Sequence, residues 1–166
     1  RSAWLLLTVL LGAVGCVGRE STPGAPAIMA VDDLGDTLRL ATPATRIVSL
    51  TITEKGYCHT PQTGDLDENH PDIVHDLQNP GTPRSAIGFL VAALARRRIA
   101  AAAPFTVLSC DNLSANGHTV GRLVTQFAAL KSPDLAKWIE AEVAFPSTMV
   151  DRIVPETTDI DRSEVS

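Results

Sequence analysis

The sequence predicts an α/β fold with a mainly parallel sheet, and three observations lead to this prediction. Residues 47–53 form a nearly continuous β-branched run, which is typical of a strand that is buried on both faces of a parallel sheet. Helix-like and strand-like segments alternate after this run, as they do in layered α/β proteins. The chain has 166 residues, of which 45% are hydrophobic and 20% are charged, so its length and composition suit one globular domain.

The elements after the first strand follow from local signals in chain order. Residues 60–69 are polar and predict a loop, and residues 71–77 predict a short helix. Ser85 is an N-cap candidate for a longer helix that reaches about residue 101, and residues 105–109 predict the second strand. The last predicted elements are a helix over residues 117–131, a helix over residues 133–142 that Ser132 caps and Pro133 opens, and a strand-like run at residues 143–145.

Residues 1–18 carry the pattern of a secretory signal segment. A single Arg1 precedes an apolar run that is too short to span a bilayer as a stable helix. Gly15 stands directly before Cys16, and this pair resembles a bacterial lipobox, which implies cleavage there and lipidation of Cys16. Membrane anchoring is therefore expected only through a lipid on Cys16.

Residues 19–45 combine a linker with a predicted β-hairpin. Gly, Pro, Ser and Thr are frequent in residues 18–26, and two alternating runs within residues 28–40 then flank a turn at residues 33–36. This hairpin resembles the opening of periplasmic binding proteins for haem, siderophores or cobalamin. The resemblance implies an alternative function, in which the chain is a lipid-anchored periplasmic binding protein for a metal chelate.

Three stretches of the chain resemble the mannitol dehydrogenase family of polyol and sugar-acid oxidoreductases. They read Thr-Ile-Thr-Glu-Lys-Gly-Tyr at residues 51–57, Leu-Ser-Cys-Asp-Asn-Leu at residues 108–113 and Met-Val-Asp-Arg-Ile at residues 149–153. The resemblance runs from about Arg46 to Arg162, and we place a join between two unrelated pieces within residues 46–50. It implies that residues 46–166 form a partial Rossmann-like, doubly wound domain, which the signal segment and the hairpin precede.

The resemblance also implies an activity for the parent enzyme, namely the interconversion of a polyol or hexonate and its keto sugar with NAD or NADP and without a metal. Small-molecule polyols or sugar acids would be its partners. The dehydrogenase part would work in the cytoplasm, whereas the signal pattern would direct export. A glycine-rich phosphate loop before residues 51–57 and a Lys-x5-Asn-x2-His motif are typical of the family and are missing from the sequence. We therefore expect a fragment with little or no activity as written.

Polar residues follow each of the three strand-like runs, at the end of the strands where a parallel sheet binds its ligands. They are Thr53 and Glu54 after the first run, Ser109, Asp111 and Asn112 after the second, and Ser147, Asp151 and Arg152 after the third. Spacing alone leaves helix capping or loop hydrogen bonding as the alternative for each residue, and it favours capping for Asp111 and Ser147.

The family resemblance assigns roles to four of these residues. Asn112 would lie beside the nicotinamide and the substrate as a catalytic and cofactor-binding residue, because an uncharged amide orients a hydroxyl without opposing hydride transfer. Glu54 and Ser109 would bind the cofactor, and Glu54 would also lie near the proton path. Asp151 would be catalytic by polarising a neighbouring basic group, and the alternative for it is an ion pair with Arg152.

The charge of the chain argues against a nucleic-acid partner. Phosphate binding needs a clustered excess of Lys and Arg, whereas the net charge here is −5. The one basic run, at residues 96–98, follows an apolar helical pattern. We predict that it is the solvated last turn of a helix, where cations complement the negative helix end.

The cysteines and histidines predict neither a metal site nor a disulfide framework. Cys58, His59, His70 and His75 match no standard spacing of zinc ligands. The three cysteines have no regular spacing, and their odd number leaves at least one unpaired. Cys110 ends an apolar run and is predicted to be a small buried hydrophobe.

Overall fold

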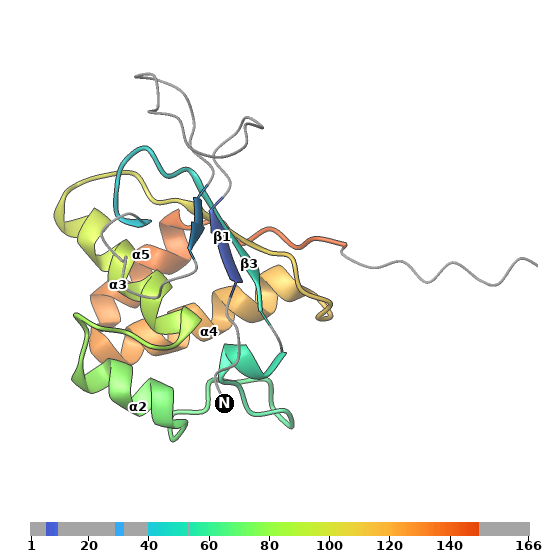
Figure 1. Cartoon of the computed structure of the whole chain (residues 1–166). Coiled ribbons are helices and arrows are strands. Elements are labelled where there is room, and N and C mark those ends of the chain that lie inside the picture. The colour runs from blue at the N-terminus through green and yellow to red at the C-terminus, as the bar shows by residue number, and fades with distance from the viewer. Residues whose placement is uncertain (1–5, 10–28, 32–39, 53, 150–166) are drawn as a thin grey trace, which may run out of the picture.

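The computed structural model describes residues 6–9, 29–31, 40–52 and 54–149, and these residues form an α/β fold (Figure 1). Within this part of the chain the sheet has four strands in the order β2-β1-β3-β4. The strands are β1 (Leu6–Val9), β2 (Met29–Val31), β3 (Ile47–Thr51) and β4 (Thr106–Ser109).

β3 and β4 form the parallel pair on which the predicted fold class depends. Val48 lies opposite Val107, and Leu50 lies opposite Ser109. Parallel neighbours need a crossover connection, which the helices between the two strands provide. Val48 and Leu50 are fully buried, as expected for a strand inside a sheet. The α/β class and both strand predictions are therefore confirmed.

The helices agree with the predicted capping signals. Between β3 and β4 lie the 3-10 helix η1 (Glu54–Tyr57) and the helices α2 (Pro71–Gln78) and α3 (Ala86–Ile99), and after β4 come α4 (Asn116–Lys131) and α5 (Pro133–Glu142). The Ser85 hydroxyl accepts a hydrogen bond from the Gly88 amide at 2.9 Å. The Ser132 hydroxyl likewise accepts from the Leu135 amide at 3.4 Å. The four predicted α-helices are confirmed.

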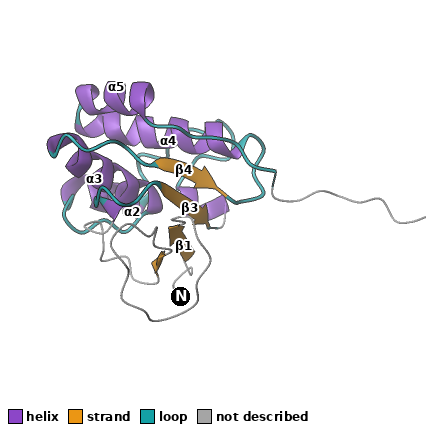
Figure 2. Cartoon of the chain, turned by 90° about the horizontal axis from the view of Figure 1, so that it is seen from above, coloured by secondary structure: helices purple, strands orange, loops and turns teal. Residues whose placement is uncertain are grey.

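One hydrophobic core joins the helices to the sheet. α4 contacts α3, α5 and β4, and Figure 2 shows these helices grouped beside β4. Leu90 of α3, Val107 of β4 and Phe127 of α4 belong to the same core cluster, and each is at most 1% exposed. This packing supports the end of β4, where the polar residues that follow the strand lie.

Arg97 corrects the prediction that the whole run at residues 96–98 is solvated. Arg96 and Arg98 are exposed, but Arg97 is 1% exposed. Its guanidinium carbon lies 5.0 Å from the centroid of the Phe105 ring. Its guanidinium donates to four backbone carbonyls, which belong to Leu40, Thr42, Thr45 and Ala103. These bonds fasten the end of α3 to the segment before β3.

The predicted hairpin and the predicted strand-like run at residues 143–145 differ from the structure. β2 pairs antiparallel with β1, where Ala30 lies opposite Thr8, whereas Leu40, expected in the second strand of the hairpin, is helical and buried. The hairpin turn itself lies outside the described residues. Residues 143–145 form no strand, because only one backbone bond is described between them and β4, from the Val107 amide to the Ala144 carbonyl at 3.0 Å.

Most of the predicted signal segment lies outside the described residues. Leu6–Val9, which belongs to the proposed signal segment, forms β1 and pairs antiparallel with β3. Cys16 lies outside the described residues. Among the residues that the structure describes, no helix has the length and apolar character needed to cross a membrane.

Candidate functional site

The carboxyl ends of β3 and β4 are joined by a buried hydrogen-bonded cluster. The Tyr57 hydroxyl lies 2.8 Å from the Ser109 hydroxyl and donates a short hydrogen bond to the Asp111 carboxylate. The other oxygen of that carboxylate accepts from the Ile52 amide at 2.8 Å. Tyr57 and Ser109 are fully buried. We call Tyr57, Ser109 and Asp111 the strand-end cluster, since they tie η1 and both strands together.

Burial keeps the Tyr57 hydroxyl of this cluster protonated. Desolvation raises the pKa of Tyr57 well above its ordinary value, and the hydrogen bond to Asp111 raises it further. Tyr57 therefore keeps its proton at neutral pH and donates it in the hydrogen bond to Asp111. Both oxygens of Asp111 have protein partners, so this carboxylate is held in a fixed orientation.

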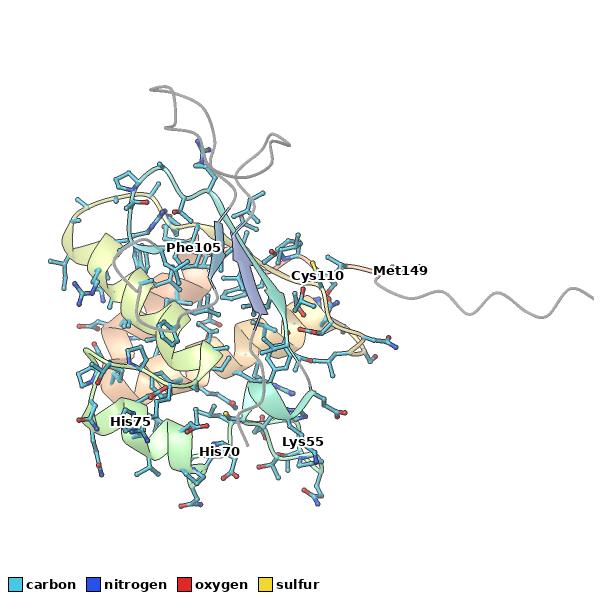
Figure 3. All side chains as sticks on the ribbon, viewed as in Figure 1. Lys55, His70, His75, Phe105, Cys110 and Met149 are labelled. Carbon is cyan, nitrogen blue, oxygen red and sulfur yellow. The ribbon has the colours of Figure 1, made fainter. Side chains whose placement is uncertain are left out.

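A second set of bonds holds the segment around Thr148 against the end of β4. The Thr148 hydroxyl donates to the Ser109 carbonyl at 2.6 Å. The buried side chain of Asn116, at the start of α4, bonds to both Asp111 and Thr148. Figure 3 labels Cys110 and Met149, which directly follow Ser109 and Thr148 in the chain, at this end of the protein.

The structure places the predicted site residues in different environments. Asn112 is exposed, directly after the strand-end cluster. Glu54 is also exposed, and one of its carboxylate oxygens lies 3.8 Å from Nε2 of His59. Ser109 is buried and its hydroxyl faces Tyr57, so its side chain serves the cluster. Asp151 lies outside the described residues. The proposed roles of these residues stay predictions.

Sequence reasoning missed Tyr57, Asn116 and Thr148. Tyr57 ends one of the stretches that carry the family resemblance, but its partner Ser109 is 52 positions away. Asn116 and Gly117 form an Asn-Gly pair, a common turn signal, although here they open α4. The residue before them, Ala115, has the left-handed φ of 47°. That conformation gave no signal in the sequence, because alanine has no preference for it.

Cys58, His70 and Asp72 offer three ligand atoms that lie within 4.8 Å of one another. Two of these groups already have protein partners, since the His70 ring accepts from the Asp72 amide at 3.3 Å and the Cys58 sulfur lies 3.8 Å from the Gly56 carbonyl. His75 instead pairs with Asp76 at 3.0 Å. The absence of a metal stays a prediction.

A cavity of about 350 Å³ lies along α4. Gly117 and Gly121 of α4, Glu140 of α5 and Phe145 line part of it. Because Gly117 follows Asn116, this cavity borders the segment that Asn116 holds. A binding experiment can distinguish this cavity from the strand ends.

Comparison with known proteins adds independent findings. The family model of the mannitol dehydrogenase Rossmann domain matches residues 23–165. The chain is 58% identical over 124 residues to the uncharacterized oxidoreductase YeiQ of Escherichia coli, which is 75% of this chain and 25% of that protein. It is 55% identical over 119 residues to the D-mannonate oxidoreductase of the same organism, which is 72% of this chain and 24% of that protein.

A solved structure agrees with these sequence matches. The mannitol 2-dehydrogenase of Pseudomonas fluorescens, in a ternary complex with NAD and D-mannitol, superposes with a TM-score of 0.67 at 46% identity. The superposition covers 78% of this chain and 26% of that one. The chain thus spans about a quarter of the length of the curated relatives it matches.

The matched stretch begins before the boundary expected from the sequence. The family model starts at residue 23, whereas the resemblance was expected to begin at about Arg46. Much of the segment that resembles a periplasmic binding protein therefore falls inside the match. The comparisons do not support a periplasmic binding protein as the alternative function.

Proposed function

The chain belongs to the mannitol dehydrogenase family, and from this premise we propose that it is the nicotinamide-binding portion of an oxidoreductase that interconverts a polyol or hexonate and its keto sugar. The parallel pair β3 and β4 supports this proposal most directly. Its carboxyl ends are fixed by the strand-end cluster, while Asn112 and Glu54 remain exposed beside them. Ligands of parallel α/β sheets bind at such strand ends.

The residues at the strand ends fit the nicotinamide half of an NAD-type cofactor. When bound, this cofactor accepts or donates a hydride. Asn112 provides an exposed, uncharged amide that can orient a carboxamide or a substrate hydroxyl. Both oxygens of Asp111 accept hydrogen bonds, from the Ile52 amide and the Tyr57 hydroxyl, so this carboxylate is held in place beside the site. The Pseudomonas relative bound to NAD and D-mannitol supports NAD as the cofactor.

We further propose that Glu54 lies on the proton path together with His59, whose Nε2 lies 3.8 Å from a carboxylate oxygen of Glu54. The Glu54 carboxylate is 68% exposed, whereas the His59 side chain is only 9% exposed. Nδ1 of His59 is buried and has no hydrogen-bond partner among the residues that the structure describes. An ionisable pair that reaches from solvent into the protein suits the transfer of a proton. Asp151, two positions after Met149, is proposed to polarise a neighbouring basic group.

We propose that the enzyme works in the cytoplasm, because nicotinamide chemistry belongs in that compartment. Fractionation of cells that produce the chain, followed by immunoblotting, tests this placement. The protein is expected in the soluble cytoplasmic fraction. Recovery in the membrane fraction together with a lipid on Cys16 would instead support export.

A chimeric enzyme tests the proposed function. The part of the Pseudomonas mannitol 2-dehydrogenase that aligns with residues 46–149 is replaced by those residues of this chain. We expect the chimera to oxidise D-mannitol with NAD, because the exchanged residues supply an equivalent strand-end site. In this chimera Asn112→Ala should lower kcat by about a hundredfold, whereas Asn69→Ala at an exposed loop position should leave it unchanged. A folded chimera without activity contradicts the proposal.

A further inference from the structure

The side chain of Asn116 is 1% exposed, and its amide is fully used in hydrogen bonds. Its Nδ2 donates to the Asp111 carbonyl at 3.0 Å, to the Thr148 hydroxyl at 2.9 Å and to the Thr148 carbonyl at 3.2 Å. Its Oδ1 accepts from the Gly117 amide at 2.8 Å and from the Thr148 amide at 2.9 Å. A side-chain amide offers two N–H groups and two lone pairs, so one N–H is shared between two of the three acceptors and no polar group of Asn116 is left over.

The Asp111 carbonyl that Asn116 holds belongs to the peptide unit that connects Asp111 to Asn112. The same carbonyl also accepts from the Leu113 amide at 2.8 Å. The turn that carries Asn112 is thus fixed from both sides, although the Asn112 side chain itself is exposed. Hydrogen bonds to the peptide unit before a residue restrict the backbone conformation of that residue.

The segment before Met149 is fitted closely to the same end of α4. A Cβ added at Gly117 would lie 2.5 Å from the Phe145 carbonyl oxygen, and one at Gly121 would lie 3.1 Å from the Phe145 ring. Glycines at these two positions let the segment approach the helix backbone. The side chain of Asn116 then bonds to three groups of Thr148, namely its backbone amide, its backbone carbonyl and its hydroxyl.

We propose that Asn116 is a positioning residue for Asn112. It orients the peptide unit before Asn112 and fixes Thr148 at the same strand end, so that the exposed amide faces the nicotinamide and the substrate. This inference rests on the proposed function only for the identity of the ligand. The link between Asn116 and Asn112 is a property of the chain and is measured separately.

The test uses the full 166-residue chain and the variant Asn116→Asp. This change keeps the size of the side chain and its acceptor oxygen, but it removes the donor that holds Asp111 and Thr148. Asn79→Asp is the matched control, because Asn79 is exposed and its Nδ2 donates to one backbone carbonyl, that of His75, at 3.0 Å. Both variants add one negative charge, and circular dichroism checks that both are folded.

NADH binding and the amide resonance of Asn112 are the two measurements. We expect Asn116→Asp to shift the Asn112 resonance and to raise the Kd for NADH by about tenfold, and Asn79→Asp to change neither. A purely structural role would lower the melting temperature and leave the Kd of the folded variant unchanged. An unshifted Asn112 resonance with an unchanged Kd overturns the inference.

The two proposals fail in different ways. If the unaltered chain does not bind NADH, the proposed function fails for this chain, and the Asn112 resonance in Asn116→Asp still decides the positioning role. If Asn116→Asp does not fold, Asn116→Ala replaces it, since that change removes the Nδ2 donor to the Asp111 carbonyl without adding a buried charge. A shifted Asn112 resonance in Asn116→Ala supports the inference, and an unshifted one overturns it.

Discussion

The hydroxyl of Tyr57 donates a hydrogen bond to the carboxylate of Asp111, and this bond joins the turn after β3 to the end of β4. The two residues are 54 positions apart. Their contact therefore links the segments that follow the two parallel strands. Ligands of parallel α/β sheets bind at this end of the strands.

The change Tyr57→Phe should destabilise the chain while preserving its packing. It removes the hydroxyl and leaves Ser109 and one oxygen of Asp111 without this partner in a buried place. We expect a loss of about 1–3 kcal/mol in the free energy of unfolding, measured by urea denaturation with circular dichroism. An unchanged denaturation midpoint would show that the bond contributes nothing to folding.

Alkaline pH should destabilise the folded chain. Burial raises the pKa of Cys58 from 9.0 to about 12, and it raises the pKa of Tyr57 above its ordinary value of 10.0. The folded state therefore keeps protons that the unfolded state has lost, so the free energy of unfolding falls as the pH rises above 9.

The chain has one tyrosine, so the ultraviolet absorbance of tyrosinate reports on Tyr57 alone. This absorbance should appear together with the loss of helical circular dichroism. Ionisation of the tyrosine near pH 10 in a chain that keeps its helices would contradict the account.

Gly117→Ala should destabilise the chain even though alanine favours helices. The helix propensity of alanine adds about 1 kcal/mol of stability. The added Cβ, however, would lie 2.5 Å from backbone atoms of Phe145 and Pro146. We expect a net loss of about 1–3 kcal/mol by urea denaturation.

Gly81→Ala is the control for Gly117→Ala. A Cβ at Gly81 would meet nothing within 4 Å, so its denaturation midpoint should stay where it is. Equal midpoints for the two variants would mean that residues 145–146 do not lie against α4 in solution.

Arg97→Lys should be costly, because an ammonium group cannot bond all four carbonyls that the guanidinium reaches. We expect a loss of about 2–4 kcal/mol in the free energy of unfolding. The exposed Arg98 provides the control, and Arg98→Lys should change stability by less than about 0.5 kcal/mol. Similar losses for both variants would contradict the buried role of Arg97.

The helices and the parallel strands could be predicted because their signals are local. Ser85 and Ser132 act as caps within three residues of their partners. Arg97 could not be placed, since charged residues at helix ends are usually solvated, and its carbonyl partners at Leu40, Thr42 and Thr45 come from a distant segment.

The sequence predicted that polar residues follow the strands at the candidate site. It did not predict which of these side chains are exposed and which are buried. Ser109 was expected to bind the cofactor, yet its hydroxyl faces Tyr57 inside the protein. Whether a polar residue after a strand points outward depends on partners far along the chain. Asn112 is exposed, and Asn116 and Leu113 bond the peptide unit before it. No local pattern in the sequence predicts these bonds.

The most direct test of the nicotinamide site is an NMR titration of the isotopically labelled chain with NADH. We predict that NADH changes the amide chemical shifts most at the strand ends, at Glu54 and Asn112, and less at Thr148. Shifts confined to Gly121 and Glu140, which line the cavity along α4, or no shifts at all, would contradict a nicotinamide site at the ends of β3 and β4.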